Sequence, residues 1–441
     1  MLRTPADCRP PNIPFLPTFF FDELACWCDG PTTIALLQLN KFVNRSISRS
    51  NLLRAAAERL VFAHGLGGAI ETAAGRGLEE IVRLLLERHA NGTRSEKQKR
   101  EWNPWQAQIL AVRSGNIPTM ALLLPTSKGD SRCDELLMTA ATLGKTEVMA
   151  FLIDRILQYT PDFDPKILDP PLCQAAAKGH CQMIGYLLTL GANLHVWKDE
   201  PLREAAAAGS AEAVTFLLDS GSKLEENWPL IHAARGGHAE VVDILLKRGA
   251  DLHAIQDLAL HEAASYGHVE VLALLLKHGA RIHSEDDYAL RHSARNGHLA
   301  AVTLLLSHGA NLHAKRDWAL QAAAKGGHFS TVLLLLENGA AVNCNDGEAL
   351  RLAALKGRTE IVRLLLQFGA NVHCRDDIAL VCAAETGHTA IVQVLLDSGA
   401  NVSTMDNAAL KRASRNKRIE TVALLLSRGA DATEKRSDAE K

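Results

Sequence analysis

Two columns of glycine divide most of the chain into units of constant length. The pair Gly-Ala recurs every 30 residues, and a second glycine near the middle of each unit is usually followed by histidine, as in Gly297-His298. Glycine after an apolar helical pattern is typical of a helix C-terminus, because it takes a left-handed conformation without a Cβ clash. Each unit is therefore predicted to form helix, turn, helix and loop. The Gly-Ala pairs begin at Gly249, Gly279, Gly309, Gly339, Gly369, Gly399 and Gly429.

The predicted second helices have a leucine-rich apolar face, and the first helices have pairs of alanine. Leucine occupies two neighbouring columns, from Leu245-Leu246 to Leu425-Leu426, and Val242 begins a third. One unit cannot enclose this face, whereas a neighbouring unit can, with ~1.5–3 kcal/mol gained for each Leu or Val fully buried. We expect an all-α stack in which short first helices approach closely through alanine and longer second helices form the other layer.

A polar column precedes each first helix by a fixed distance. Its residues belong to the set that caps helix N-termini, so we interpret the column as structural, with each side chain satisfying amides of its own helix. The column contains Asp169, Asp199, Asn227, Asp257, Asp287, Asp317, Gly347, Asp377 and Asn407.

These motifs together resemble ankyrin repeats. The helix–turn–helix–loop unit, the Ala-Ala pair, the Gly-His turn, the leucine-rich second helix and the Gly-Ala-Asn/Asp ending all match over about residues 162–431. The resemblance implies an ankyrin-repeat solenoid that binds a protein partner on its concave face, formed by first helices and loops. The family's common unit has ~33 residues. We therefore expect the projecting hairpin to be three residues shorter here.

The organisation along the chain follows from where the repeats are regular. We expect a helical N-terminal segment (1–60), irregular repeats (61–160) with a polar insert (91–101), nine regular repeats (161–431) and a polar tail (432–441). The insert contains the basic run Lys97-Gln-Lys-Arg100, which is compatible with a nuclear-import signal or with a solvated loop.

The N-terminal segment resembles a divergent F-box. The match consists of a Leu-Pro pair, an apolar helix, a turn and a second apolar run. It implies docking to the adaptor subunit of a cullin-type ubiquitin ligase, with the repeats selecting substrates. A helical cap on the first repeat is the alternative. The residues that carry the resemblance are Leu16, Pro17, Leu24, Ile34, Leu36 and Leu39.

Composition and charge narrow the classes of partner. Hydrophobic residues make up 47% and charged residues 22%, as in an ordinary folded protein. The net charge of −2 provides no chain-wide basic field for nucleic acid or anionic membrane. Neither a signal peptide nor an apolar run of ~18–20 residues is evident. We expect a monomeric cytoplasmic protein, with the nucleus as a second compartment, and neither nucleic acid nor membrane as a partner.

Histidine and cysteine are numerous but not arranged for chemistry. The column His195, His253, His283, His313 and His373 places one ring in each unit. Neighbouring units are separated by ~8–10 Å, whereas zinc ligands lie ~2.0–2.3 Å from one ion. The nine cysteines are scattered, as expected for reduced thiols. Without a phosphate loop or nucleophile motif, we predict no enzyme, no metal and no cofactor.

The remaining candidate is a protein-binding surface on the first helices. The position after the polar column is often large and apolar, which favours a partner surface, although these side chains are equally suited to covering the shortened hairpin of the next unit. Basic residues near the helix ends favour an acidic peptide, as do Arg203, Arg291, Arg351 and Lys411 near the helix starts. We therefore predict an interaction scaffold; the alternative is a ubiquitin-ligase substrate receptor. The candidate contacts are Trp228, Leu258, Tyr288, Trp318, Ile378, Arg235, Arg295 and Lys325.

Overall fold

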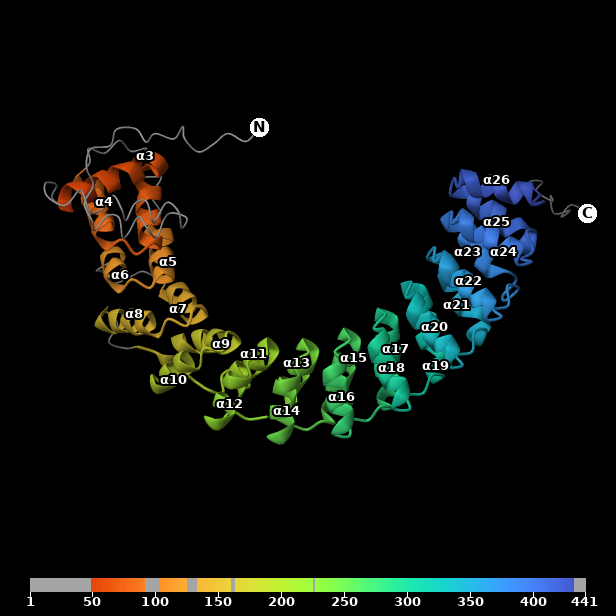
Figure 1. Cartoon of the computed structure of the whole chain (residues 1–441), viewed down its shortest axis with the longest axis horizontal. Helices are drawn as coiled ribbons and strands as arrows, with labels where there is room; N and C mark the ends of the chain where they lie inside the picture. Colours follow the sequence, from red (N-terminus) through yellow and green to blue (C-terminus); the bar gives the residue numbers. More distant parts are fainter. Residues whose placement is uncertain (1–48, 92–103, 125–132, 160–162, 225–226, 432–441) are drawn as a thin grey trace, which may run out of the picture. The chain divides into compact units, whose positions relative to one another are not determined.

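The computed structural model describes residues 49–91, 104–124, 133–159, 163–224 and 227–431, and every element in these ranges is a helix (Figure 1). The F-box-like residues and the basic run after Asn91 lie outside them. Contacts divide the chain into two compact units, one comprising residues 1–175 and 182–193 and the other 176–181 and 194–441. Among the described helices, none is both long enough and apolar enough to span a bilayer.

The first unit consists of irregular helical pairs. Within the pairs α3/α4, α5/α6 and α7/α8, the turns contain Gly77, Gly115 and Gly144, all with positive φ. Ile70, Leu85 and other large side chains are fully buried between the helices. The helices are α3 (Arg49–Gly75), α4 (Glu79–Asn91), α5 (Pro104–Ser114), α6 (Ile117–Leu123), α7 (Cys133–Thr142), α8 (Thr146–Tyr159), the 3-10 helix η3 (Pro165–Leu168), and α9 (Asp169–Ala177) and α10 (Cys181–Thr189), which both cross the division.

The second unit repeats one helical pair in sequence order (Figure 1). Within this stack, each first helix packs on the first helix of the next unit, and each second helix packs on the next second helix. For example, α17 packs on α19, and α18 packs on α20. The pairs are α11 (Glu200–Ala208) and α12 (Ala211–Asp219), α13 (Trp228–Gly236) and α14 (Ala239–Lys247), α15 (Ala254–Tyr266) and α16 (Val269–Lys277), α17 (Ser284–Asn296) and α18 (Leu299–Ser307), α19 (Ala314–Gly326) and α20 (Phe329–Glu337), α21 (Cys344–Leu355) and α22 (Thr359–Gln367), α23 (Ile378–Thr386) and α24 (Thr389–Asp397), and α25 (Thr404–Arg415) and α26 (Ile419–Ser427).

The apolar columns form the core largely as predicted. Leu245 and Val242 are fully buried, as are their equivalents in the next five units, and the Ala-Ala pairs of the first helices are buried too. In the neighbouring leucine column, which begins at Leu246, most side chains are only half-buried, although Leu336 is buried and Leu426 is exposed. The expected difference in helix length is wrong, because α13 and α14 each have nine residues.

The polar column joins neighbouring units instead of capping its own helix, which corrects the N-cap interpretation. Asp199 and Asp377 make no side-chain hydrogen bond to their own helices. The Asp317 carboxylate accepts a hydrogen bond from the Ala341 amide, 24 residues further along the chain, at 3.0 Å. Its other partner is His313 Nδ1 at 2.9 Å. The same bond to a later amide is made by Asp169, Asp199, Asn227, Asp257, Asp287, Asp377 and Asn407, at 2.6–3.1 Å.

One unit makes this connection with a different residue. The column has Gly347, where a Cβ would lie 2.8 Å from the Cβ of Cys374. Asn343, which occupies the histidine position of this unit, accepts a hydrogen bond from the Asn371 amide at 2.7 Å and donates one to the Gly369 carbonyl at 3.0 Å. The loss of the carboxylate is therefore compensated four residues earlier.

The Gly-His turns provide a second connection between units. His328 lies with Nε2 3.0 Å from the carbonyl oxygen of Arg295, and His298 lies the same distance from that of Ser265. A Cβ on Gly297 would lie 2.3 Å from His328 Nδ1, so the next unit leaves no space for a side chain there. Glycine is needed both for its φ of +78° and for this close packing.

Left-handed turns occupy the place of the projecting hairpin. Lys315, Arg316 and Asp317 have φ of +48°, +58° and +53°. Such a conformation costs ~1–2 kcal/mol for each L residue, so the surrounding bonds must hold it. The first helix then follows directly, and the loop stays short. Three consecutive residues adopt this conformation at 197–199, 255–257, 285–287, 315–317, 345–347, 375–377 and 405–407.

Candidate protein-binding face

The predicted apolar contact residues all lie at the starts of first helices. Trp228, Leu258, Tyr288, Trp318 and Ile378 belong to α13, α15, α17, α19 and α23, and each is half-buried. Their positions repeat once per unit, and consecutive first helices pack on each other. The residues therefore follow one face of the second unit, which we call the first-helix face.

Three neighbouring units bring their rings into one row, which we call the aromatic row. The Tyr288 ring stacks on His292 with centroids 3.7 Å apart, and His292 in turn stacks on Trp318 at 5.6 Å. On the other side, Tyr288 lies 4.5 Å from the ring of His261. The row extends from α15 to α19 with its rings held by one another, so it presents ordered, half-buried aromatic surface.

The row is uncharged near neutral pH. Burial, reinforced by the charges of Arg291 and Arg295, lowers the pKa of His292 to about 4. Burial also lowers the pKa of His261. Neutral imidazole stacks without the cost of desolvating a cation. His292 therefore extends the half-buried aromatic surface of Tyr288 and Trp318, and the buried His261 supports the Tyr288 ring from below the surface.

The predicted basic residues lie at the opposite ends of the same helices. Arg235, Arg295 and Lys325 are exposed in the last turns of α13, α17 and α19. Tyr288, His292 and Arg295 follow each other at spacings of four and three residues, which places them on one side of α17. An aromatic start and a cationic end therefore share one helix face.

Two of the basic residues near the helix starts, Arg203 and Arg291, have internal roles, which corrects the expectation that they extend the basic surface, whereas Lys411 is exposed beside Asp406. Arg291 is buried and donates hydrogen bonds to the Asp286 and Glu285 carbonyls, both at 2.9 Å. Arg203 donates to the Trp197 carbonyl at 3.1 Å. These guanidinium groups satisfy carbonyls of the left-handed turns and are not available to an acidic peptide.

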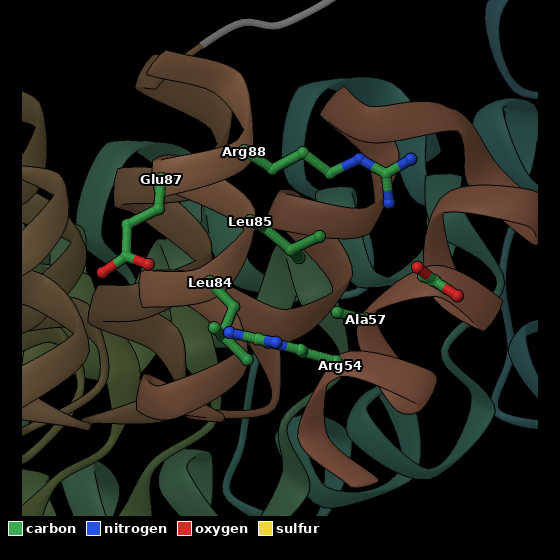
Figure 2. A pocket seen from close by; sticks show the side chains of 7 residues that line it. Arg54, Ala57, Leu84, Leu85, Glu87 and Arg88 are labelled. Atoms are coloured by element: carbon green, nitrogen blue, oxygen red, sulfur yellow. The ribbon is translucent and has the colours of Figure 1, made fainter. Parts of the chain in front are cut away.

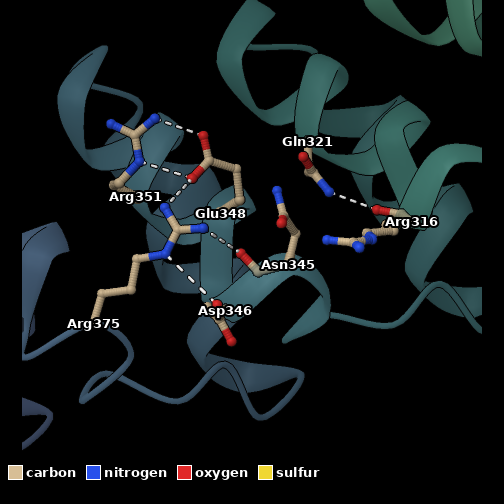
Figure 3. Close-up of polar contacts among 7 residues, drawn as sticks. All are labelled: Arg316, Gln321, Asn345, Asp346, Glu348, Arg351 and Arg375. Carbon is tan, nitrogen blue, oxygen red and sulfur yellow. Dashed lines mark hydrogen bonds and ion pairs between the residues drawn. The ribbon is translucent and has the colours of Figure 1, made fainter.

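The next unit has acid–base pairing at the positions of the row (Figure 3). Glu348 replaces the aromatic residue and receives hydrogen bonds from Arg351 Nε at 2.8 Å and Arg375 Nη1 at 3.0 Å. Arg375 also donates to the Asn345 carbonyl at 3.0 Å. The hydrogen bonds from Arg351 are the largest cause of a lowered Glu348 pKa. We call this group the Glu348 network.

A signal that would have located the central surface is present in the sequence. Between Tyr288 and Leu336 the chain has a single acidic residue, Asp317. That side chain is buried and bonded to the next unit. The exposed charges of this stretch are therefore positive, although the chain as a whole has a net charge of −2. Comparing the units by charge would have shown this contrast, as would the four-residue spacing of Tyr288 and His292.

The first unit contains a cavity of about 230 Å³ between α3 and α4. Figure 2 shows Arg54 and Arg88 on either side of Leu85, and the two arginines are balanced by Glu58 and Glu87 in the lining. This mixture of charges does not select a ligand of either sign. Within the described ranges, no three His, Cys, Asp or Glu side chains are grouped as metal ligands would be.

Five overlapping segments match the family model described as ankyrin repeats in three copies, namely residues 172–256, 202–286, 255–316, 290–376 and 350–436. Together they extend over more than half of the chain. The protein belongs to the ankyrin-repeat family. Ankyrin repeats are protein–protein interaction modules, so the stack is an interaction scaffold and the fold is typically not enzymatic.

One solved structure that the chain resembles is the human ASB11 ankyrin repeat domain. The two are 26% identical, with a TM-score of 0.42, and the match covers 46% of this chain and 99% of that domain. No curated protein matches the chain.

Proposed function

We propose that this ankyrin-repeat protein binds an acidic segment of a partner protein on the first-helix face, the concave face expected from the family. The contact is centred on the aromatic row and on Arg295 and Lys325. The observation that carries the proposal is the combination of stacked, half-buried rings with exposed cations on α17 and α19, where the only acidic residue from Tyr288 to Leu336 is buried.

Each part of this surface makes a different contribution to binding. Aromatic side chains are frequent anchors in protein interfaces, and rings already ordered by stacking lose little conformational entropy when a partner binds. The cations add attraction for carboxylates, which mainly raises the association rate and selects for acidic partners. Trp228, Leu258 and Ile378 extend the apolar surface along the neighbouring units.

A peptide selection on the full-length protein tests the proposal. We expect a random library to yield acidic sequences whose affinity falls as salt rises, because exposed charges are screened. The double variant Arg295→Glu/Lys325→Glu should weaken these peptides at least about tenfold in fluorescence anisotropy, equivalent to 1.4 kcal/mol. Both side chains are exposed, so folding should be retained.

Lys277→Glu is the matched control, since it reverses an exposed charge at the end of the second helix α16. It should change the affinity less than about twofold, which is well below the tenfold loss expected for the double variant. Selected peptides that are not acidic, or that bind the double variant and the control equally, would contradict the proposal.

The F-box-like segment supports a second candidate function, that of a substrate receptor for a cullin-type ubiquitin ligase. The residues of this resemblance lie outside the described part of the chain, so the support comes from sequence. A truncation at Arg59 would cut α3, which begins at Arg49. The better test compares full-length protein with Leu16→Ala/Pro17→Ala in a pull-down. Loss of the ligase adaptor from the variant alone would support the receptor function, and its absence from both would exclude it.

A further inference from the structure

Two exposed apolar side chains lie where the first and second helices of the central units meet. Leu299 begins α18 and Phe329 begins α20, and they are 41% and 43% exposed. The two helices pack on each other. The same position has a small or polar residue in three other units, namely Ala239, Thr359 and Thr389, whereas it is apolar in α16 (Val269) and in the last helix α26 (Ile419). Among the described second helices, only α18 and α20 are neighbours that both begin with a large exposed apolar residue.

Charge at this place also differs from that of the other units. The first turns of α18 and α20 have no acidic residue, and Ala300 and Ser330 follow the apolar positions. Arg295 and Lys325 are exposed at the ends of α17 and α19, just before the turns. Most other second helices have glutamate at the corresponding place, namely Glu212, Glu240, Glu270, Glu360 and Glu420, whereas α10 has Gln182 and α24 has Ala390.

Hydrogen bonds between units hold this region in a fixed arrangement. His328, directly before Phe329, lies 3.0 Å from the Arg295 carbonyl. In the preceding pair of units, Asn296 donates to the Ser265 carbonyl at 2.7 Å. A partner therefore meets side chains on an ordered backbone, which reduces the entropy lost on binding.

We propose that Arg295, Leu299, Lys325 and Phe329 form a second contact surface, the turn edge, which takes an apolar side chain flanked by carboxylates. The inference rests on the proposed function, because the same partner segment would occupy both surfaces. Arg295 lies seven residues after Tyr288, about 10 Å along the helix. About three residues of extended chain cover that distance, so one short segment reaches from the aromatic row to the turn edge.

Charge complementarity determines the chemistry of the occupant. Two cations beside two apolar side chains, with no acidic residue in the first turns of α18 and α20, favour a ligand with the opposite charge and matching apolar groups. We therefore expect selected peptides to place acidic residues between two apolar positions, one for each surface.

The double variant Leu299→Asn/Phe329→Asn tests the turn edge with the peptides selected on the full-length protein. Both residues are exposed, so the variant should fold. We expect it to weaken binding at least about tenfold. Phe368→Asn is the matched control, because Phe368 is similarly exposed after α22, at the opposite end of a second helix. It should change binding less than about twofold.

The outcomes separate this inference from the proposed function. Peptides that lose affinity for Trp318→Ala but bind the turn-edge variant normally would contradict the turn edge and leave the proposed function in place. Loss in the turn-edge variant, with the control unchanged, supports the inference. A library that yields no peptide for the wild-type protein contradicts both.

Discussion

The central units, from α17 to α20, and the following unit, α21 and α22, use the same helix positions in opposite ways. At the position after the polar column, α17 and α19 have Tyr288 and Trp318, whereas α21 has Glu348. Arg291 donates to carbonyls of its own turn, and its guanidinium lies 5.8 Å and 5.4 Å from the ring centroids of Tyr288 and Trp318. Arg351 instead pairs with Glu348, which also binds Arg375. The same helix position thus presents half-buried aromatic rings in one place and an ion-paired carboxylate in the other.

This contrast shows that binding surface is a local property of the stack. The core columns and the connections between units are shared, so they determine only that the units pack together. Substitution at a few exposed or half-buried positions decides where a partner gains contacts. The predictions below separate the shared stability from the local differences, beginning with the largest effect.

Truncating the shared core should have the same large effect in both regions. Leu305→Ala and Leu365→Ala remove fully buried side chains, and each should lower the free energy of unfolding by ~2–5 kcal/mol because a cavity remains. Chemical denaturation measures the loss, with the exposed Lys315→Ala as control. A core truncation no more harmful than the control would contradict the repeat register.

Removing the connection between units should cost more in the central region than in the following unit. Asp317→Ala removes a buried carboxylate that bonds both the Ala341 amide and His313 Nδ1, a loss of ~1–3 kcal/mol. Asn343→Ala removes the equivalent bond to Asn371 at an exposed site. Water can replace it there, so we expect ~0.5–1.5 kcal/mol. Urea unfolding measures both losses. A larger loss of unfolding free energy for Asn343→Ala than for Asp317→Ala would contradict the comparison.

The Glu348 network should stabilise the protein modestly and in a pH-dependent way. Because Arg351 holds the folded-state pKa below the ordinary value of 4.5, the stabilisation is complete above that value and is lost as pH falls through the lowered pKa. Glu348→Gln should cost ~1 kcal/mol at about pH 7. Denaturation at about pH 3 should show a smaller difference between variant and wild type. A difference that grows in acid would contradict the ion pairing.

The smallest expected effect is a change in the pKa of His292, which lies in the aromatic row. The folded pKa of His292, about 4, lies below the ordinary 6.5. Its neutral form therefore contributes stability above about pH 6.5 that is lost as pH falls towards 4. NMR of the imidazole protons should show a midpoint near 4, and Trp318→Ala should move it upwards by exposing the ring. An ordinary midpoint in the wild type would contradict the stacking.

Sequence periodicity predicted the parts of the fold that depend on local pattern. The column of Leu245 and the turn glycines follow from helical spacing and from left-handed caps. The hydrogen bond between Asp317 and the Ala341 amide was not predicted, because Ala341 lies in the next unit. An aspartate directly before a helix is commonly an N-cap of that helix, so the sequence favoured that role instead. The left-handed turn at Lys315 was missed because neither this residue nor Arg316 favours positive φ.

The candidate face could be predicted residue by residue but not as an arrangement. The sequence identified Tyr288, Trp318, Arg295 and Lys325, since each occupies a repeating position. How closely the rings of neighbouring units approach depends on the shortened loop, whose conformation was not predicted. The burial of Arg291 follows from the same turn, because its carbonyls are the acceptors of that side chain.

Binding of one selected acidic peptide to Trp318→Ala and to Glu348→Ala compares the two regions most directly. Both variants shorten a half-buried side chain at the same position of the first helix, and circular dichroism would verify that each remains folded. We predict at least an about tenfold weaker complex for Trp318→Ala and less than about twofold change for Glu348→Ala. Equal losses, or a larger loss for Glu348→Ala, would contradict the assignment of partner binding to the central units.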